Sequence, residues 1–191
     1  MTASHSYLAL VALLLGGIAV CLISSFVRES YLRTKYPVCY ASSVEQYSTQ
    51  YDIPPSLLYS VIRTESKFEP DAVSVAGAVG LVQMLPSTFR WLSDEMLGEH
   101  LPDGMLFDPE TNIRYGACYL RLLYNRYQNW TTAIAAYNAG IGNVDTWLSD
   151  PTLCVSEHTL NPEMIPFRET RQYVAAVTKA QTYYRTLYGW E

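Results

Sequence analysis

One glutamate in the sequence lies where an ordinary surface carboxylate would not. Leu58, Val61 and Ile62 recur at helical intervals, and Glu65 follows them by seven, four and three residues. Residues at these spacings share one face of a helix, so Glu65 falls on the apolar face rather than the solvent face. Burial disfavours the charged form of a carboxyl group and raises its pKa. Glu65 is therefore a candidate general acid, the kind of group that protonates the leaving oxygen of a glycosidic bond.

This helix alone leaves a second interpretation open. A carboxylate that pairs with a nearby arginine, or one at a frayed helix end, would have the same spacing from the apolar residues. One amphipathic helix does not identify an enzyme, and only residues elsewhere in the chain can distinguish the two interpretations.

Five short blocks of sequence follow one another along the chain. They are Arg63-Thr64-Glu65-Ser66, then Ser74 to Met84 with Gly80-Leu81-Val82-Gln83 inside it and Pro86-Ser87-Thr88 after it, Asn112-Ile113-Arg114-Tyr115-Gly116, Ala136-Tyr137-Asn138-Ala139-Gly140, and Ile165-Pro166-Phe167-Arg168-Glu169-Thr170-Arg171-Gln172-Tyr173-Val174. In this order and spacing they resemble the Slt-type (soluble-lytic-transglycosylase-like) family of peptidoglycan lytic transglycosylases. The resemblance covers about residues 44–188. It implies a lysozyme-like, mostly α-helical domain with a long sugar-binding groove, in which Glu65 is the catalytic acid.

The resemblance also implies a reaction with one carboxylate, whereas most glycosidases use two. Glu65 would protonate the oxygen that links N-acetylmuramic acid to N-acetylglucosamine, and the N-acetyl oxygen of the substrate would stabilise the anomeric carbon. Glu65 would then act as a base on the C6 hydroxyl, which closes on C1 and leaves a 1,6-anhydro end. The expected activity is that of a murein lytic transglycosylase acting on peptidoglycan glycan strands, without a cofactor.

Five residues of these blocks are expected to bind substrate, namely Ser66, Gln83, Met84, Tyr137 and Asn138. Three have competing structural interpretations. The Ser66 hydroxyl could instead bond the backbone at the helix end, Gln83 could be a solvated loop residue, and spacing alone would put Tyr137 in the core. The family's usual Gly-Leu-Met-Gln here has valine at position 82, a change that keeps the position apolar, and we expect it to alter one wall of the groove.

Glu169 is the best candidate for a second acidic residue in the groove. Its structural alternative is equally strong, because a glutamate in the first turn of a helix is stabilised by the helix dipole without any substrate. Trp91, Trp130 and Trp147 stand in helical contexts, so we expect them to pack in the core rather than stack on sugars.

Three other functions compete with this interpretation. A hydrolase of the same fold, similar to goose-type lysozyme, would need an acidic residue to activate water, and the sequence does not place Asp52, Asp71 or Glu169 relative to Glu65. A non-catalytic wall-binding module would have lost its acid, which is intact here. A membrane-anchored interaction protein would leave the series of blocks unexplained.

Helices are the elements expected to position these residues. Ser42 and Glu45 have the spacing of a capping box, and Asp108-Pro109-Glu110 is a strong helix start. Gly140 is a natural helix stop. The predicted helices begin near residues 42, 55, 86, 109, 131, 144 and 168, with loops at 71–84, 97–107 and 149–165. The predicted organisation is a short N-terminal tail at 1–6, a transmembrane anchor or signal segment at 7–27, a linker at 28–43 and one catalytic domain at 44–191, mostly α with minor β.

The segment from Tyr7 to Val27 contains no charged residue. As a helix it would span roughly 32 Å, which is about the thickness of the hydrocarbon core of a bilayer. It is longer than the apolar region of a usual signal peptide and no A-x-A-like site closes it, although Ser25 leaves cleavage open. We therefore favour a retained single-pass anchor. Arg28, Arg33 and Lys35 follow it and would by themselves favour a cytoplasmic domain, whereas a peptidoglycan substrate requires the domain to lie outside the bacterial membrane.

Charge and cysteine content narrow the remaining possibilities. The net charge of −5 argues against a nucleic-acid partner, which would need a basic face. The three histidines are scattered and the four cysteines fit no zinc spacing, so no metal is implied. Cys39, Cys118 and Cys154 leave open one disulfide with a spare thiol or three reduced thiols. Protein partners cannot be inferred from the sequence.

Overall fold

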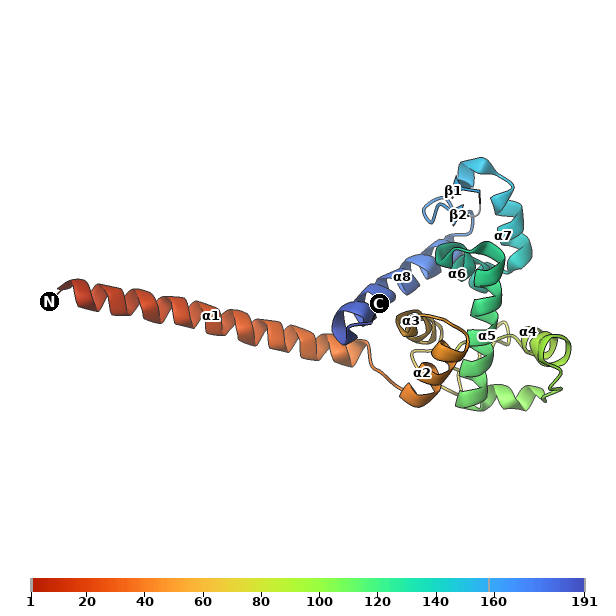
Figure 1. The fold of residues 1–191 in the computed structure, drawn as a ribbon, viewed down its shortest axis with the longest axis horizontal. Coiled ribbons are helices and arrows are strands. Elements are labelled where there is room, and N and C mark those ends of the chain that lie inside the picture. The colour runs from red at the N-terminus through yellow and green to blue at the C-terminus, as the bar shows by residue number, and fades with distance from the viewer. Residues whose placement is uncertain (1, 158, 191) are drawn as a thin grey trace. The chain divides into compact units, whose positions relative to one another are not determined.

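The computed structural model describes residues 2–157 and 159–190 and divides the chain into two compact units. The first is Met1–Pro37 and the second is Val38–Glu191. Each is considered by itself (Figure 1).

The first unit consists of one helix, α1 (Thr2–Lys35). It continues past residue 27, where the sequence suggested that a linker begins, and Arg33 pairs with Glu29 one turn before it at 2.8 Å. Within the described part, Leu13–Lys35 has the length and the mean hydropathy (1.6) of a membrane span. A signal sequence would have the same properties at this position.

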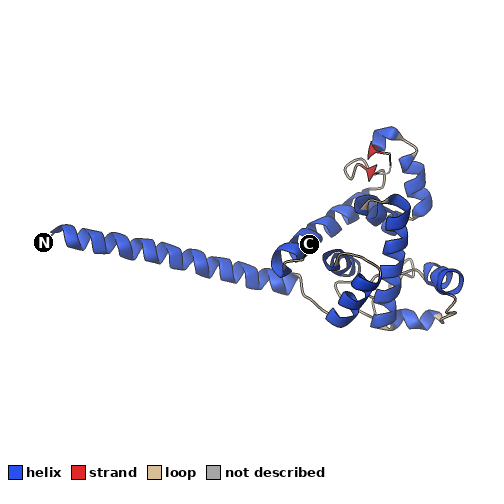
Figure 2. Ribbon diagram, in the orientation of Figure 1, coloured by secondary structure: helices blue, strands red, loops and turns tan. Residues whose placement is uncertain are grey.

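The second unit is mostly helical with a small sheet, as expected (Figure 2). Its α-helices are α2 (Ala41–Gln50), α3 (Pro55–Glu65), α4 (Pro86–Arg90), α5 (Pro109–Tyr127), α6 (Trp130–Ala139), α7 (Ile141–Leu148) and α8 (Arg168–Tyr188). A π-helical segment, Trp91–Leu97, continues α4, and 3₁₀ turns cover Asp103–Phe107 and Pro151–Leu153. The strands β1 (Cys154–Ser156) and β2 (Thr159–Leu160) pair antiparallel with a bulge.

The core of this unit forms where α3 packs against α8, and where α6 packs against both α5 and α8. Leu58, Val61 and Ile62 are fully buried, as their spacing predicted. Val174 and Val177 of α8 are buried as well. The apolar face of α3 therefore lies inside the domain, and Glu65 is the last residue of that helix.

The helix ends agree with the sequence at some positions and not at others. Asp108 caps α5 by accepting a 2.8 Å hydrogen bond from the Thr111 amide, as predicted. Gly140 ends α6 with φ +86°, also as predicted. The capping box at Ser42 was wrong: α2 begins at Ala41 after a left-handed Tyr40, and no side chain caps it.

The helix expected to run to about residue 68 ends at Glu65. Lys67 and Phe68 both adopt positive φ, which takes the chain out of the helical path.

The loop after α3 folds into a compact turn that the side chain of Asn112 holds in place. The Asn112 amide donates to the carbonyls of Val79 (3.1 Å) and Leu106 (2.8 Å), and its oxygen accepts from the Val82 amide (2.8 Å). Gly80, with φ +78°, approaches so closely that a Cβ there would lie 2.3 Å from the Asn112 side-chain nitrogen. One buried asparagine on α5 thus fixes the loop that carries Gln83 and Met84.

Candidate active site

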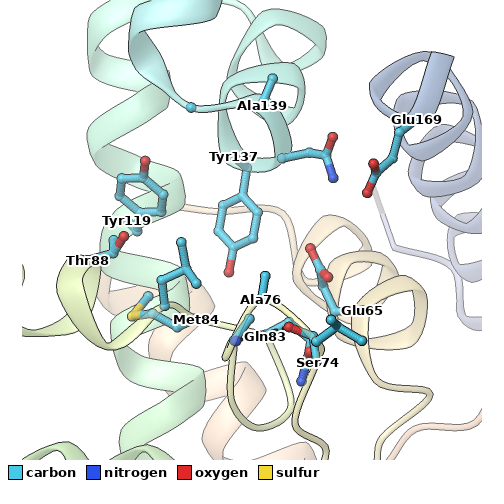
Figure 3. A pocket seen from close by; sticks show the side chains of 15 residues that line it. Glu65, Ser74, Ala76, Gln83, Met84, Thr88, Tyr119, Tyr137, Ala139 and Glu169 are labelled. Atoms are coloured by element: carbon cyan, nitrogen blue, oxygen red, sulfur yellow. Dashed lines mark hydrogen bonds between the residues drawn. The ribbon is translucent and has the colours of Figure 1, made fainter. Parts of the chain in front are cut away.

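A cavity of about 540 Å³ opens beside the end of α3 (Figure 3). The loop 74–85, the N-terminus of α4, α5, the end of α6 and the start of α8 complete its walls. Its lining residues are Glu65, Ser74, Val75, Ala76, Ala78, Gln83, Met84, Leu85, Thr88, Tyr119, Tyr137, Asn138, Ala139, Gly140 and Glu169. The cavity therefore brings together Glu65 and five of the six residues expected to accompany it.

Glu65 reaches this cavity from a half-buried position. Burial chiefly, and the negative charge of Glu169 in addition, raise the pKa of Glu65 from 4.5 to about 7, although the hydroxyl of Tyr173 opposes the rise. About half of the Glu65 side chains are then protonated near neutral pH. A carboxyl group in this state can donate a proton in one step and accept one in a later step.

Two residues of α8 act on Glu65 from one helix face. Glu169 lies in the first turn, is exposed to solvent and faces the cavity, where Figure 3 shows its carboxylate turned toward Glu65. Tyr173, one turn later, is buried, and its hydroxyl has no hydrogen-bond partner in the described part of the chain that meets normal geometry. Its dipole is nevertheless close enough to lower the pKa of Glu65. Sequence reasoning missed Tyr173, although its spacing of four from Glu169 predicts a shared face.

Tyr137 lines the cavity and is also anchored to the fold. Its hydroxyl donates a 2.8 Å hydrogen bond to the Val82 carbonyl, and its ring lies 5.4 Å from that of Tyr119. Burial, the charge of Glu65 and the neighbouring Tyr119 raise the pKa of Tyr137 well above its usual value, so this phenol stays neutral. The backbone bond holds the aromatic ring as a fixed wall of the cavity.

Gln83 and Met84 come from the loop that Asn112 braces. Gln83 has φ +47°, and its amide nitrogen donates to the carbonyls of Ala72 and Gly80, at 3.0 Å each. The loop thus engages the amide nitrogen and leaves the side-chain oxygen as the group that can accept from a ligand. Met84 is buried and contributes an apolar surface to the cavity.

Asn138 follows Tyr137 in the last turn of α6. Its side-chain oxygen accepts a 2.8 Å hydrogen bond from the Thr170 hydroxyl on α8. With the oxygen occupied, the amide nitrogen is the part of Asn138 that can donate to a ligand.

Ser66 was expected to bind substrate and does not line the cavity. It is buried, its hydroxyl lies 2.8 Å from the Leu81 carbonyl and 3.3 Å from that of Ile62, and it accepts from the Phe68 amide at 3.1 Å. These bonds correspond to the alternative interpretation, in which the hydroxyl bonds the backbone. Ser74, which sequence reasoning did not single out, lines the cavity instead.

Two other sequence expectations need correction, and the positions of three acids that the sequence left open are now known. Val82 is fully buried, and a Cβ at Gly116 would meet its side chain at 2.8 Å, so Val82 packs in the core and forms no wall of the groove. Trp147 is buried as expected, whereas Trp91 and Trp130 are only half-buried. The acids Asp52 and Asp71 are absent from the cavity lining, and of the three considered as water activators only Glu169 lies there.

Nothing in the described residues suggests a metal site, since no three His, Cys, Asp or Glu side chains gather at a suitable distance across 2–157 and 159–190. Cys39, Cys118 and Cys154 are free thiols in this structure.

Comparison with known proteins identifies the family. Residues 42–152 match the family described as Transglycosylase SLT domain, whose members are lyases that cleave glycosidic bonds. The chain belongs to this family. It is 35% identical over 161 residues to the soluble lytic murein transglycosylase of Escherichia coli (strain K12), which covers 83% of this chain and 25% of that protein. It is also 35% identical over 166 residues to the membrane-bound lytic murein transglycosylase C of Actinobacillus succinogenes, covering 76% of this chain and 46% of the relative.

Solved transglycosylase structures share the lysozyme-like fold. The 70-kDa soluble lytic transglycosylase of Escherichia coli superimposes with a TM-score of 0.74 at 35% identity, covering 83% of this chain and 26% of that chain. An inactive mutant of lytic transglycosylase Slt from Pseudomonas aeruginosa, in which a glutamate is replaced by glutamine, gives 0.73 at 34% identity over 82% of this chain and 25% of that one. The chain thus spans about a quarter of the length of its soluble transglycosylase relatives.

Proposed function

We propose that this chain is a peptidoglycan lytic transglycosylase that cleaves the β-1,4 bond between N-acetylmuramic acid and N-acetylglucosamine, with Glu65 as acid and then base. The observation that carries the proposal is one carboxyl group with a pKa of about 7 that lines a cavity of about 540 Å³. A relative that carries a glutamine for a glutamate is described as inactive, which supports a decisive role for one glutamate in this family.

The proposed reaction proceeds in two steps. Protonated Glu65 donates its proton to the glycosidic oxygen, the bond from C1 breaks, and the N-acetyl oxygen of the substrate stabilises the positive charge at C1. The carboxylate that results then removes the proton of the C6 hydroxyl, whose oxygen closes on C1. The net reaction consumes no water and returns Glu65 to its protonated form.

The neighbours of Glu65 suit this reaction. The Gln83 side-chain oxygen can accept from an acetamido N–H, and the Asn138 amide nitrogen can donate to a sugar oxygen. Tyr137 and Met84 offer apolar surface to the faces of the sugar rings. Glu169, with its charge turned toward Glu65, favours the neutral acid before the first step.

The alternative function is a muramidase that hydrolyses the same bond, and the position of Glu169 is the observation that favours it. Glu169 is the other carboxylate among the cavity residues and would have to activate a water molecule. Glu169→Gln would abolish a hydrolase of this kind. In a transglycosylase it would only change the pKa of Glu65.

The deciding experiment is digestion of purified peptidoglycan by the full-length chain in detergent, alongside Glu65→Gln, with products read by mass spectrometry. We expect 1,6-anhydro products from the unmodified chain and none from Glu65→Gln. Products heavier by one water, with reducing ends, would replace the proposal by hydrolysis. Binding of peptidoglycan without any cleavage would favour a non-catalytic wall-binding module.

We also propose that α1 anchors the chain in the bacterial cell membrane as a single pass, with the second unit outside. The apolar segment of α1 and the similarity to a membrane-bound lytic murein transglycosylase support the anchor, and the substrate requires the orientation. Protease added to intact, wall-stripped cells should digest the second unit. Protection of that unit would refute the orientation.

A further inference from the structure

A second cavity, of about 670 Å³, lies on the other side of α5 from the catalytic cavity. Tyr119 of α5 lines the first cavity, whereas Arg121 and Tyr124 line the second. Residues two and five positions further along a helix point roughly opposite to the first. The remaining walls come from the end of α2, the turn before α3 and the start of α6, through Ser48, Thr49, Asp52, Ile53, Pro54, Pro55 and Trp130. The two cavities share no residue.

Aromatic side chains form one wall of this second cavity. The rings of Tyr124 and Trp130 stack with centroids 4.2 Å apart and planes 28° apart, and the Arg121 guanidinium lies 5.2 Å from the Tyr124 ring centre. Trp130 was expected in the core and is instead half-buried at the cavity wall. Arg121, Tyr124 and Trp130 therefore form a stack of side chains that lines the cavity.

Polar groups lie next to this stack. Arg121 donates to a carboxylate oxygen of Asp52 at 2.8 Å and to its backbone carbonyl at 3.1 Å. The Asp52 side chain is 86% exposed, so its carboxylate can still accept from a ligand. Ser48 is 2% exposed, and its hydroxyl has no hydrogen-bond partner among residues 2–157 and 159–190. A buried hydroxyl without a partner is unfavourable, and a ligand that bonds it would remove that cost.

This combination is typical of a site for a neutral, polyhydroxylated ring. The C–H groups on one face of a pyranose carry partial positive charge and pack against the negative face of an aromatic ring. An ion pair offers donors and acceptors together without net charge, which suits hydroxyl and acetamido groups better than a phosphate or a free carboxylate. Ile53 and the two prolines supply the apolar remainder that ligand cavities generally have.

We propose that the second cavity is a non-catalytic binding site for one saccharide unit of an N-acetylated glycan strand. Trp130 and Tyr124 pack against the ring, while Asp52, Arg121 and Ser48 bond its polar groups. That the strand is peptidoglycan rests on the proposed function, whereas saccharide binding itself does not. A strand held here keeps the enzyme on the wall while another strand enters the catalytic cavity.

The test uses the full-length Glu65→Gln chain in detergent, so that no sugar is consumed, with 5-fluorotryptophan at its four tryptophans. The probe is the tetramer of N-acetylglucosamine, and Trp130→Phe, which keeps an aromatic ring in place, assigns the Trp130 fluorine signal. We expect this signal to shift saturably at millimolar sugar. Arg121→Gln should weaken that binding about tenfold.

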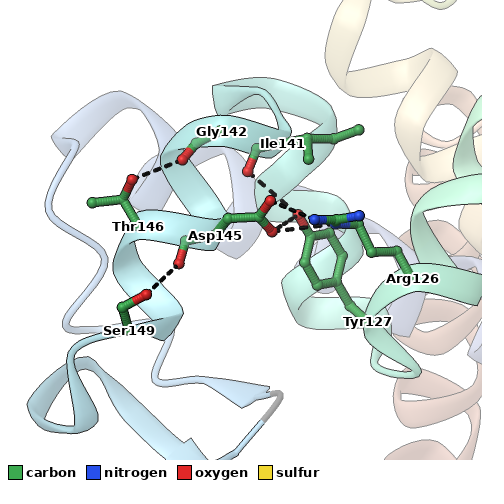
Figure 4. A network of polar contacts seen from close by, with 7 residues as sticks. All are labelled: Arg126, Tyr127, Ile141, Gly142, Asp145, Thr146 and Ser149. Atoms are coloured by element: carbon green, nitrogen blue, oxygen red, sulfur yellow. Dashed lines mark hydrogen bonds and ion pairs between the residues drawn. The ribbon is translucent and has the colours of Figure 1, made fainter.

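A matched control variant is available on the same helix. Arg126 also pairs with an aspartate, Asp145 (2.5 Å), and lies 5.7 Å from the ring of Tyr127, but it is outside the second cavity (Figure 4). Arg126→Gln should leave the saccharide response of Trp130 unchanged. Equal weakening by Arg121→Gln and Arg126→Gln would overturn the proposal. A Trp130 fluorine signal that does not shift while the sugar shifts the signals of other tryptophans would also overturn the proposal. The same holds for a Trp130 signal that shifts with a peptidoglycan stem peptide and not with the sugar.

The two proposals fail separately. If the unmodified chain releases anhydro products while the Trp130 fluorine signal does not shift with the sugar, the second site is refuted and the proposed function stands. If Trp130 responds while the unmodified chain leaves peptidoglycan intact, the saccharide site stands without the proposed activity.

Discussion

Replacing Glu65 by glutamine should stabilise the protein, and the gain should grow with pH. The folded state raises the pKa of Glu65 from 4.5 to about 7, chiefly because the side chain loses contact with water. A carboxyl group with a raised pKa gives up its proton more readily in the unfolded chain. Its contribution to stability is therefore largest below pH 4.5 and is lost as the pH rises from 4.5 to 7. Glutamine has nearly the same shape and cannot ionise, so it escapes this loss.

The size of the effect follows from the two pKa values. Relative to a neutral side chain, Glu65 costs the folded state about 3 kcal/mol at pH 8 and about 1 kcal/mol at pH 5. The difference in unfolding free energy between Glu65→Gln and the unmodified chain should thus increase by about 2 kcal/mol between these pH values. Any contribution that does not depend on pH cancels in this comparison.

Urea denaturation at pH 5 and pH 8, followed by tryptophan fluorescence, measures this difference. Trp91, Trp130, Trp147 and Trp190 all lie in the second unit, so the signal reports on the domain and not on α1. Glu163→Gln, at an exposed position, serves as the control and should change stability equally at both pH values. If Glu65→Gln has the same effect at pH 5 and pH 8, the carboxyl group is not desolvated, and the argument for a general acid fails with it.

Three further predictions follow from individual contacts. Glu169→Gln removes a charge that raises the pKa of Glu65. The loss of activity on the alkaline side of the pH profile should therefore begin at lower pH. A pH profile identical to that of the unmodified chain would show that the charge does not act on Glu65. Tyr137→Phe leaves the buried Val82 carbonyl without its 2.8 Å partner and should cost about 1–3 kcal/mol of stability, measured by urea denaturation; no loss would mean that water replaces the phenol. Asn112→Ala removes three buried hydrogen bonds and should lower the free energy of unfolding by more than about 3 kcal/mol, and with it the melting temperature. An unchanged melting temperature would contradict the role given to this side chain.

The sequence predicted those parts of the site that depend on helical periodicity. Leu58, Val61 and Ile62 are buried, and Glu65 follows on the same face, because the spacing of side chains around a helix is fixed by its geometry. The helix start at Asp108 and the stop at Gly140 were equally readable, since each depends on the chemistry of one residue and its immediate neighbours.

Contacts between distant segments could not be predicted in the same way. From the sequence, the Ser66 hydroxyl could bond either the substrate or the backbone. The Leu81 carbonyl that it bonds lies fifteen residues away in the chain. The valine at position 82 replaces the methionine of the family's usual Gly-Leu-Met-Gln, and on that ground it is expected to alter one wall of the groove. An irregular loop has no fixed spacing that separates cavity residues from core residues, and the packing against Gly116 shows that Val82 points into the core.

The protonation state of Glu65 depends on two distant elements at once. The end of α3 supplies the burial that raises its pKa, and α8 adds two opposing influences one helical turn apart: the charge of Glu169 raises the pKa, and the hydroxyl of Tyr173 lowers it. Because α3 packs against α8, these influences are held in place by the same contacts that form the core. A substitution that loosens the α3–α8 contact should therefore change the pH dependence of catalysis before it unfolds the domain, since the pKa responds to small changes in hydration and distance.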